Sequence, residues 1–277
     1  MPRYAAIQMQ PTLLDPEANL AKVVTWIREA HARGAQVAVF PECALTGYAL
    51  SAAEADAVAE PIPGPRIARL ADACRDQDML AVVGTIEADE EGRCFNTAVL
   101  LGPQGILACY RKTHLPYLGI DRYLAAGDAI GPPIGTSAGR LGVLICYDLR
   151  LPEPARLLAL AGAQALLLPT AWPASARLYP EFLARARAAE NGLYLIAANR
   201  IGEERGTQYL GRSLIAGPDG EMLAQATPDQ EQMLIADIDP ARSDQKKRVL
   251  IPGEYELDLI GDRRPDLYAP LTSQGDR

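Results

Sequence analysis

Short apolar runs alternate with helical segments along most of this 277-residue chain, and this alternation limits its fold more than any other feature. Short apolar runs bounded by Pro, Gly or polar residues are typical of buried strands. The helical segments carry apolar residues three and four positions apart. The first begins at Asp15-Pro16, which supplies an N-cap and then Pro at the first helical position. The sequence therefore predicts an α/β protein in which helices cover buried sheets.

The predicted strands span residues 4–10, 36–40, 79–86, 94–101, 106–110, 141–146, 165–168, 194–198, 213–216 and 222–226. The predicted helices span residues 15–34, 65–77, 153–161 and 176–191. An internal similarity supports two related halves. In both 34–41 and 162–169, a helix ends at Gly-Ala-Gln and leads into a buried strand stopped by Pro. This pattern favours two α/β halves whose sheets pack face to face.

One apolar run ends in a cysteine. The run 141–146 ends at Cys146, and the chain then turns through Tyr147-Asp148 toward the helix predicted from 153. A thiol at such a corner is held by backbone on both sides and can face a cavity. Amides at the start of the following helix can lower the pKa of a thiol and can stabilise an oxyanion. The sequence therefore predicts that Cys146 is a nucleophile.

The partners of this thiol must be found among few candidates, because the chain has only two histidines. His31 lies in the last turn of a predicted helix, where a cation is favoured without any catalytic role. His114 lies near a strand end and could orient a neighbour, and Lys112 beside it is the more promising cation. Glu42 is the candidate base, since it follows the predicted strand 36–40 and faces the crevice where α/β sheets bind ligands.

The three candidates lie in three motifs, Phe40-Pro-Glu42-Cys-Ala-Leu-Thr-Gly-Tyr48, Tyr110-Arg-Lys112-Thr-His-Leu-Pro116 and Leu144-Ile-Cys146-Tyr-Asp-Leu-Arg-Leu-Pro-Glu153. These motifs, in this order, resemble the nitrilase superfamily of carbon–nitrogen hydrolases. In that family the residues matching Cys146, Glu42 and Lys112 are the nucleophile, the general base and the oxyanion stabiliser. The resemblance covers nearly the whole chain. It implies one domain over residues 1–277 with the family's four-layer α-β-β-α sandwich.

The implied chemistry needs these residue types. An amide carbonyl is a poor electrophile, so attack requires a strong nucleophile and charge stabilisation on the oxygen. Glu42 would take the proton of the Cys146 thiol and pass it to the departing nitrogen, and would later activate water to hydrolyse the thioester. The Lys112 ammonium and the Tyr147 N–H would face the oxyanion, where one preorganised donor is typically worth ~3–4 kcal/mol.

One feature departs from the family. Its members often carry a second Glu between the Lys and the Cys, but no Glu occurs from Lys112 to Cys146. Asp121 is the acidic residue nearest the expected place. The spacing from Asp121 to Gly127 differs by one residue from the family's pattern, and the Asp side chain is one methylene shorter than Glu. Two interpretations of Asp121 stay open here: a replacement for the missing Glu, and a carboxylate on the loop surface.

The substrate class is suggested by the residues after the nucleophile. Nitrilases commonly have Trp-Glu after the Cys, whereas Cys146 is followed by Tyr147-Asp148, as in amidases and carbamoylases. The first hypothesis is therefore an amidase for small linear carboxamides. An N-carbamoyl hydrolase is the second, and a nitrilase, a catalytically silent scaffold and a redox-sensing thiol protein are further alternatives. The candidate substrate contacts are Tyr48, Tyr117, Tyr147, Trp172 and Tyr179, with a purely packing role for Trp172 as the alternative.

Composition excludes several other classes. The net charge of −8 argues against nucleic acids and anionic membranes as partners, since both require basic patches. The five cysteines have no regular spacing, and no apolar stretch reaches ~20 residues, which favours a reducing cytoplasm. The absence of metal-ligand spacing and of phosphate or dinucleotide fingerprints predicts no metal and no cofactor. The tail from about residue 244 shows no helical periodicity. The family resemblance suggests that it packs at a homodimer interface, with packing on its own domain as the alternative.

Overall fold

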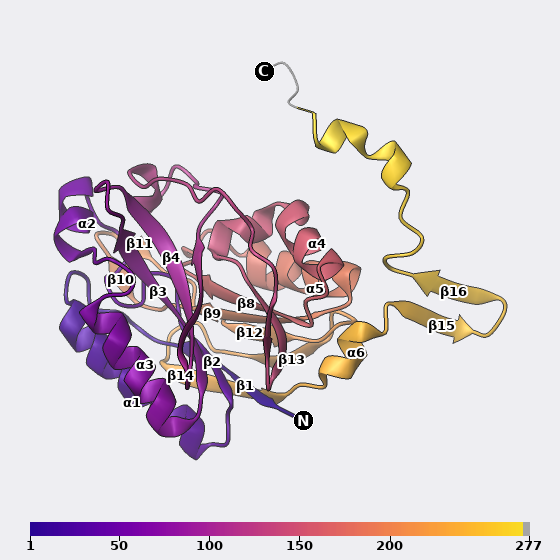
Figure 1. Ribbon diagram of the computed structural model, residues 1–277, viewed down its shortest axis with the longest axis horizontal. Helices are drawn as coiled ribbons and strands as arrows, with labels where there is room; N and C mark the ends of the chain where they lie inside the picture. The colour runs from indigo at the N-terminus through magenta and orange to yellow at the C-terminus, as the bar shows by residue number, and fades with distance from the viewer. Residues whose placement is uncertain (274–277) are drawn as a thin grey trace.

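Two six-stranded mixed sheets form the centre of the computed structural model, which describes residues 1–273 (Figure 1). The first sheet has the order β14-β1-β2-β3-β4-β5 and the second β13-β12-β9-β8-β7-β6. The first comprises β1 (Arg3–Gln8), β2 (Val37–Val39), β3 (Leu80–Ala88), β4 (Cys94–Gly102), β5 (Gly105–Arg111) and β14 (Gln232–Asp237). The second comprises β6 (Ile134–Thr136), β7 (Gly139–Val143), β8 (Ala165–Thr170), β9 (Tyr194–Asn199), β12 (Leu214–Ala216) and β13 (Met222–Gln225).

Helices cover the outer faces of the two sheets (Figure 1). The covering helices are α1 (Pro16–Ala32), α3 (Pro65–Gln77), α4 (Pro152–Leu160) and α5 (Ala184–Asn191). Two shorter helices, α2 (Ala52–Val58) and α6 (Pro240–Asp244), lie in the connections after β2 and β14. α1 and α3 pack on the first sheet, while α4 and α5 pack on the second. The α-β-β-α sandwich predicted from the sequence is therefore confirmed.

Alternation of side chains along β1 explains the layers. Tyr4 and Ala6 belong to the core between the sheets, whereas Ala5 and Ile7 belong to the core under α1 and α3. Successive residues of a strand point to opposite faces. A strand buried on both faces is apolar at nearly every position, which is why these strands could be recognised as continuous apolar runs.

Some elements differ from the sequence prediction. The sequence analysis did not predict α2, β14 or the two-stranded sheet formed by β10 (Glu203–Glu204) and β11 (Thr207–Gln208). The predicted helix 176–191 is divided into a π-helical turn, Tyr179–Leu183, and then α5. Pro180 lies in that turn, lacks a backbone N–H and crowds the preceding carbonyls, so the turn widens. Asp15 caps α1 as predicted, and its side chain accepts a hydrogen bond from the Ala18 N–H.

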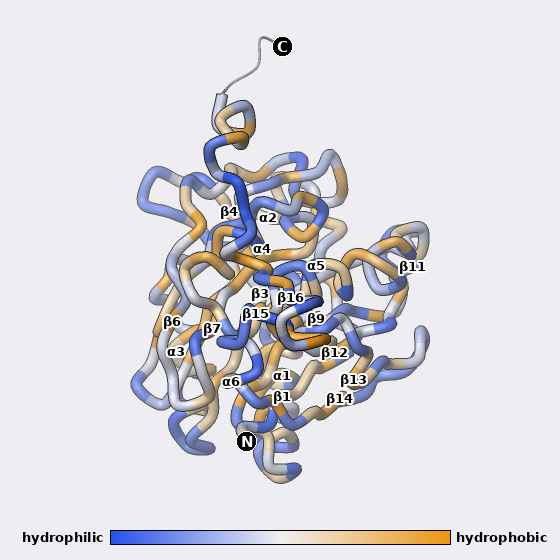
Figure 2. The backbone as a smooth tube through the Cα atoms, turned by 90° about the vertical axis from the view of Figure 1, so that its right-hand side faces the viewer, coloured by the Kyte–Doolittle hydropathy of each residue, from blue (hydrophilic) through white to orange (hydrophobic). Residues whose placement is uncertain are grey.

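The tail forms an arm that projects from the sandwich (Figure 1). It contains the antiparallel hairpin β15 (Lys247–Ile251) and β16 (Tyr255–Asp258), which the sequence did not predict, and then two short 3₁₀ turns. The hairpin carries exposed hydrophobic residues (Figure 2). The end of the predicted tail and domain, residues 274–277, lies outside the described residues. Within residues 1–273, no helix combines the length and apolar composition needed to cross a bilayer.

Candidate active site

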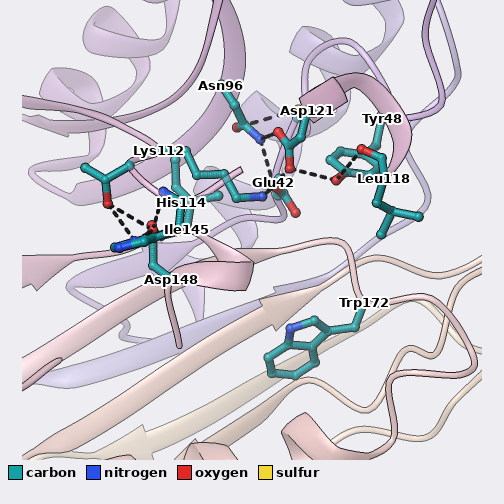
Figure 3. Close-up of polar contacts among 12 residues, drawn as sticks. Glu42, Tyr48, Asn96, Lys112, His114, Leu118, Asp121, Ile145, Asp148 and Trp172 are labelled. Carbon is teal, nitrogen blue, oxygen red and sulfur yellow. Dashed lines mark hydrogen bonds and ion pairs between the residues drawn. The ribbon is translucent and has the colours of Figure 1, made fainter. Parts of the chain in front are cut away.

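Three catalytic candidates lie near one another at the carboxyl ends of strands from both sheets: Lys112 pairs with Glu42 (Figure 3), and both charges act on the Cys146 thiol. Glu42 lies just beyond β2 and Lys112 just beyond β5 in the first sheet, and Cys146 lies just beyond β7 in the second. The Glu42 N–H donates to the Thr170 carbonyl of β8 at 3.3 Å, which links the two sheets here. Gly84 of β3 lets the loop that carries Glu42 pack closely against this strand, because a Cβ at this position would lie 2.5 Å from the Cys43 nitrogen.

Lys112 is held between two carboxylates. Its Nζ donates to Glu42 Oε1 at 2.6 Å and to Asp121 Oδ2 at 2.5 Å. Asn96 of β4 joins the same carboxylates, because its Nδ2 donates to Glu42 Oε1 at 2.7 Å and to Asp121 Oδ1 at 2.9 Å. The Tyr48 hydroxyl donates to Asp121 Oδ2 at 2.8 Å. The side chains of Glu42, Lys112 and Asp121 are fully buried, so bulk solvent does not contact this hydrogen-bonded cluster.

The interpretation of Asp121 as a surface carboxylate is therefore wrong. Asp121 lies in a 3₁₀ turn, Gly119–Arg122, and is 2% exposed. The shorter Asp side chain still reaches Lys112 and Asn96 from this turn. Sequence spacing could not reveal this, because the path of a loop depends on what it packs against.

Burial and ion pairing shift the pKa values of Glu42 and Lys112 in opposite directions. Burial raises the pKa of Glu42, Lys112 opposes this, and the net pKa stays raised. Burial would lower the pKa of Lys112, but the Asp121 and Glu42 carboxylates outweigh burial and hold it well above its usual value. The two carboxylates therefore favour the ammonium form of Lys112, and burial gives Glu42 a raised proton affinity. Glu42 Oε2 has no hydrogen-bond partner among the described residues, which leaves this oxygen free to accept a proton.

Cys146 occupies a strained corner. Its φ is +45°, a left-handed conformation that residues other than glycine rarely adopt, and it begins a short 3₁₀ helix, Cys146–Arg150. Burial and the nearby Glu42 carboxylate raise the pKa of the thiol, although Lys112, Thr170 and the Ala171 amide oppose the rise. The lowering that backbone amides can produce is present through Ala171, but burial outweighs it. Burial prevails at the corner, so the resting thiol is protonated and needs a base.

The predicted substrate contacts have different positions. Tyr48 is buried against Asp121, and Trp172 is 1% exposed with its ring stacked on Tyr179 at a centroid distance of 5.3 Å. Tyr147 is partly buried next to Cys146. Tyr117 is 89% exposed, and its ring lies 5.7 Å from the Arg122 guanidinium, so it does not line the buried cluster. Substrate contact by these residues stays a prediction.

Two polar residues of the site were missed by the sequence analysis. Asn96 interrupts an apolar strand, and a buried polar position in such a run was the available signal. Glu204 is 4% exposed and accepts hydrogen bonds from the Tyr48 and Ala49 N–H groups at 3.0 and 2.9 Å, which fixes the loop after Glu42. It also pairs with Arg200 four residues earlier, but its contacts to Tyr48 and Ala49, about 155 residues away, could not be recognised from the sequence. No group of three metal-ligating side chains occurs within residues 1–273.

Comparison with known proteins identifies the family. Residues 3–248 match the family model described as carbon-nitrogen hydrolase. The chain belongs to this family. A nitrilase of Pyrococcus abyssi is 38% identical over 97% of this hydrolase and 99% of its own length. A human omega-amidase is 30% identical over 96% of both chains.

Solved structures agree with the family assignment. An amidase from Nesterenkonia sp. AN1 has 28% identity and a TM-score of 0.80, covering 98% of this hydrolase and all of that chain. A mutant of that amidase shows Michael addition of acrylamide at the active site cysteine. The present chain is thus an amidase-type hydrolase with an active-site cysteine that acts on carbon–nitrogen bonds other than peptide bonds. The silent-scaffold and redox-sensor alternatives are set aside.

Proposed function

We propose that this hydrolase is an amidase that cleaves small linear carboxamides to a carboxylate and ammonia. The observation that carries the proposal is the buried arrangement of Lys112 between Glu42 and Asp121, beside the Cys146 thiol. A fixed ammonium, a carboxylate with raised proton affinity and a protonated thiol are the groups that amide cleavage requires.

In the first half-reaction, Glu42 Oε2 removes the proton of the Cys146 thiol as the sulfur attacks the carbonyl carbon. The carbonyl oxygen becomes an oxyanion that faces the Lys112 ammonium and the Tyr147 N–H. Each such donor is worth ~3–4 kcal/mol in a dry site. Glu42 then gives its proton to the nitrogen, the carbon–nitrogen bond breaks, and ammonia leaves behind a thioester on Cys146.

In the second half-reaction, Glu42 takes a proton from a water molecule that attacks the thioester. The same donors face the second oxyanion. The carbon–sulfur bond then breaks, the thiol regains the proton from Glu42, and the carboxylic acid departs. Asp121 does not take part in proton transfer, and we assign it the role of holding Lys112 in place.

An N-carbamoyl hydrolase remains the second candidate, because the same groups would cleave a carbamoyl carbon–nitrogen bond. The amidase reading is favoured by the amidases among the relatives, including an (R)-stereoselective amidase from a Pseudomonas species that is 32% identical. Structures of the Nesterenkonia amidase describe adducts of acrylamide and of fluoroacetamide, both small amides. Candidate substrate-binding residues remain Tyr48, Tyr147 and Trp172.

A substrate panel tests this proposal. Ammonia release is measured over small aliphatic amides, N-carbamoyl amino acids and nitriles, with Cys146→Ala as the blank. The proposal requires the highest kcat/KM on an aliphatic amide. A maximum on an N-carbamoyl compound or on a nitrile, with amides at the blank level, would replace it.

We also propose that a second copy of the chain covers the projecting arm. The arm exposes apolar residues along its hairpin and its end: Val249, Leu250, Ile251, Tyr255, Leu257, Leu267 and Leu271. α4 adds Leu157, which is 52% exposed. Exposed hydrophobic surface grouped in this way is typical of an interface.

Light scattering after size exclusion should give a dimer for the parent and a monomer for Leu250→Asp. The matched control Leu223→Asp, on β13, should remain dimeric, and a monomeric parent would refute the proposal.

A further inference from the structure

The carboxylate of Asp148 is fully buried two residues after the thiol. Its Oδ2 accepts a hydrogen bond from the Ile145 N–H at 3.0 Å, and the Asp148 N–H donates to the Ile145 carbonyl at 3.0 Å. This reciprocal pair encloses Cys146, whose φ of +45° is unfavourable for a residue with a Cβ. Asp148 therefore supports the conformation that directs the thiol.

The same carboxylate also holds the segment that carries Lys112. Oδ2 accepts from the Tyr110 hydroxyl at 2.8 Å, and Oδ1 accepts from the Thr113 hydroxyl and the His114 N–H at 3.1 Å each. His114 Nδ1 lies 2.8 Å from Oδ1 (Figure 3). These residues flank Lys112 on both sides. A single buried anion therefore joins the end of β5 to the corner at Cys146.

This link crosses between the two sheets. Lys112 follows a strand of the first sheet and Cys146 follows a strand of the second, so no shared strand fixes their separation. Asp148 itself lies among donors from the protein, with its oxygens occupied. It has no free oxygen directed at the thiol, and its influence on catalysis must pass through the two segments that it binds.

We propose that Asp148 and His114 form a positioning pair that sets the separation of the Cys146 thiol and the Lys112 ammonium. The proposal rests on the catalytic roles proposed above for those two residues. Attack by the thiol and stabilisation of the oxyanion by the ammonium occur in the same transition state. A displacement of ~1 Å between such groups can lower the rate about 10²-fold.

Asp148→Asn provides the first test, because it keeps the shape and removes one acceptor. The amide NH₂ must then face backbone N–H donors at either Ile145 or His114. We expect kcat on the best amide to fall about 10²-fold while KM changes less than about threefold, since the loss arises in the transition state. Kinetics are measured well below the melting temperature, which is determined by circular dichroism. The matched control is Glu60→Gln, a buried carboxylate that accepts from Arg66 at 2.9 Å, and it should lose stability but keep kcat.

A milder pair of variants decides the question if Asp148→Asn does not fold. His114→Ala removes the side-chain donor, and we expect kcat to fall about tenfold, as the loss of one hydrogen bond to a charged group would cause. His114→Asn places an amide Nδ2 near the position of Nδ1, so it should restore most of kcat. If His114 only filled space, His114→Asn would not restore kcat, because Asn is smaller than His.

Two controls separate this proposal from the proposed function. If Cys146→Ala is inactive while every Asp148 and His114 variant keeps wild-type kcat, only the positioning role is refuted. If Cys146→Ala keeps most of its activity, the proposed mechanism itself fails. Low kcat in the Asp148 or His114→Ala variant, together with recovery in His114→Asn, supports the positioning pair.

Discussion

Asp121→Asn removes one of the two anions that hold Lys112. The variant has the same shape, but one carboxylate oxygen becomes an NH₂ group. In the parent, Asp121 Oδ2 accepts hydrogen bonds from Lys112 and Tyr48, and Oδ1 accepts one from Asn96. An amide has only one acceptor oxygen, so its NH₂ group must face a donor on one of these two sides. The Lys112 ammonium keeps only Glu42 as a charged partner, so we expect it to move away from the position of the oxyanion.

The expected loss can be worked from these contacts. A misplaced oxyanion donor costs about 2.7 kcal/mol in the transition state, which is a fall in kcat/KM on the order of 10²-fold. Stability should also fall, because Asp121 is 2% exposed and paired. Removing one partner of a buried ion pair costs ~3–5 kcal/mol, and the remaining Glu42 contact places the expected loss near the lower end, at about 3 kcal/mol.

Steady-state ammonia release gives kcat/KM for the parent and the variant, and urea unfolding followed by circular dichroism gives the free energy of unfolding. Asp128→Asn is the matched control, since Asp128 is an exposed carboxylate in the same connection. It should change kcat/KM by less than twofold, within the ~0.5 kcal/mol expected of surface changes. A change under about threefold in Asp121→Asn would refute the reasoning, and Lys112 would then be positioned by Glu42 and Asn96 alone.

Three further outcomes are expected. Cys146→Ala should abolish turnover, because the thiol is the nucleophile, and leave the far-ultraviolet circular dichroism unchanged, because only one buried sulfur atom is removed; turnover above a few per cent of the parent would contradict this. Iodoacetamide should inactivate the enzyme, whereas EDTA should not, and inactivation by EDTA that zinc reverses would show the thiol mechanism to be incomplete. His114 should make stability depend on pH, because its hydrogen bond to Asp148 raises its pKa. The stabilisation should be fully present below the unfolded pKa of about 6.5 and disappear as pH rises through the higher folded value. Urea unfolding of the parent and His114→Asn between about pH 5 and 9 should therefore show a difference that shrinks with rising pH, and a difference independent of pH would exclude the charged pair.

Local patterns were sufficient for many elements of the fold. α3 has the predicted bounds, Pro65–Gln77, and the capping of α1 by Asp15 was visible in the sequence. These features depend on neighbours along the chain. β14 was missed because it forms by pairing with β1, more than two hundred residues away in the chain. The hairpin of the arm was overlooked although Pro252-Gly253 marks its turn.

In the active site too, some features could be predicted from local sequence, whereas others depend on contacts between distant parts of the chain. The order of the motifs indicated Glu42, Lys112 and Cys146, but it could not show that Asp121 is buried or that Tyr117 is exposed. It also could not show that burial raises the pKa of the thiol. Exposure and pKa depend on all surrounding groups, including those from the other sheet.

The sequence by itself therefore determined the class of fold, the residues able to carry out amide chemistry and the family. Periodicity and motif order are properties of the linear chain and can be recognised before the chain folds. The tertiary structure decided that Asp121 reaches Lys112, that Asn96 bridges two carboxylates, and that Asp148 joins the segments carrying the thiol and the ammonium. Those contacts connect residues distant in sequence, and hydrogen bonding and burial act only over a few ångströms, so their strength is fixed only once the two sheets have packed together.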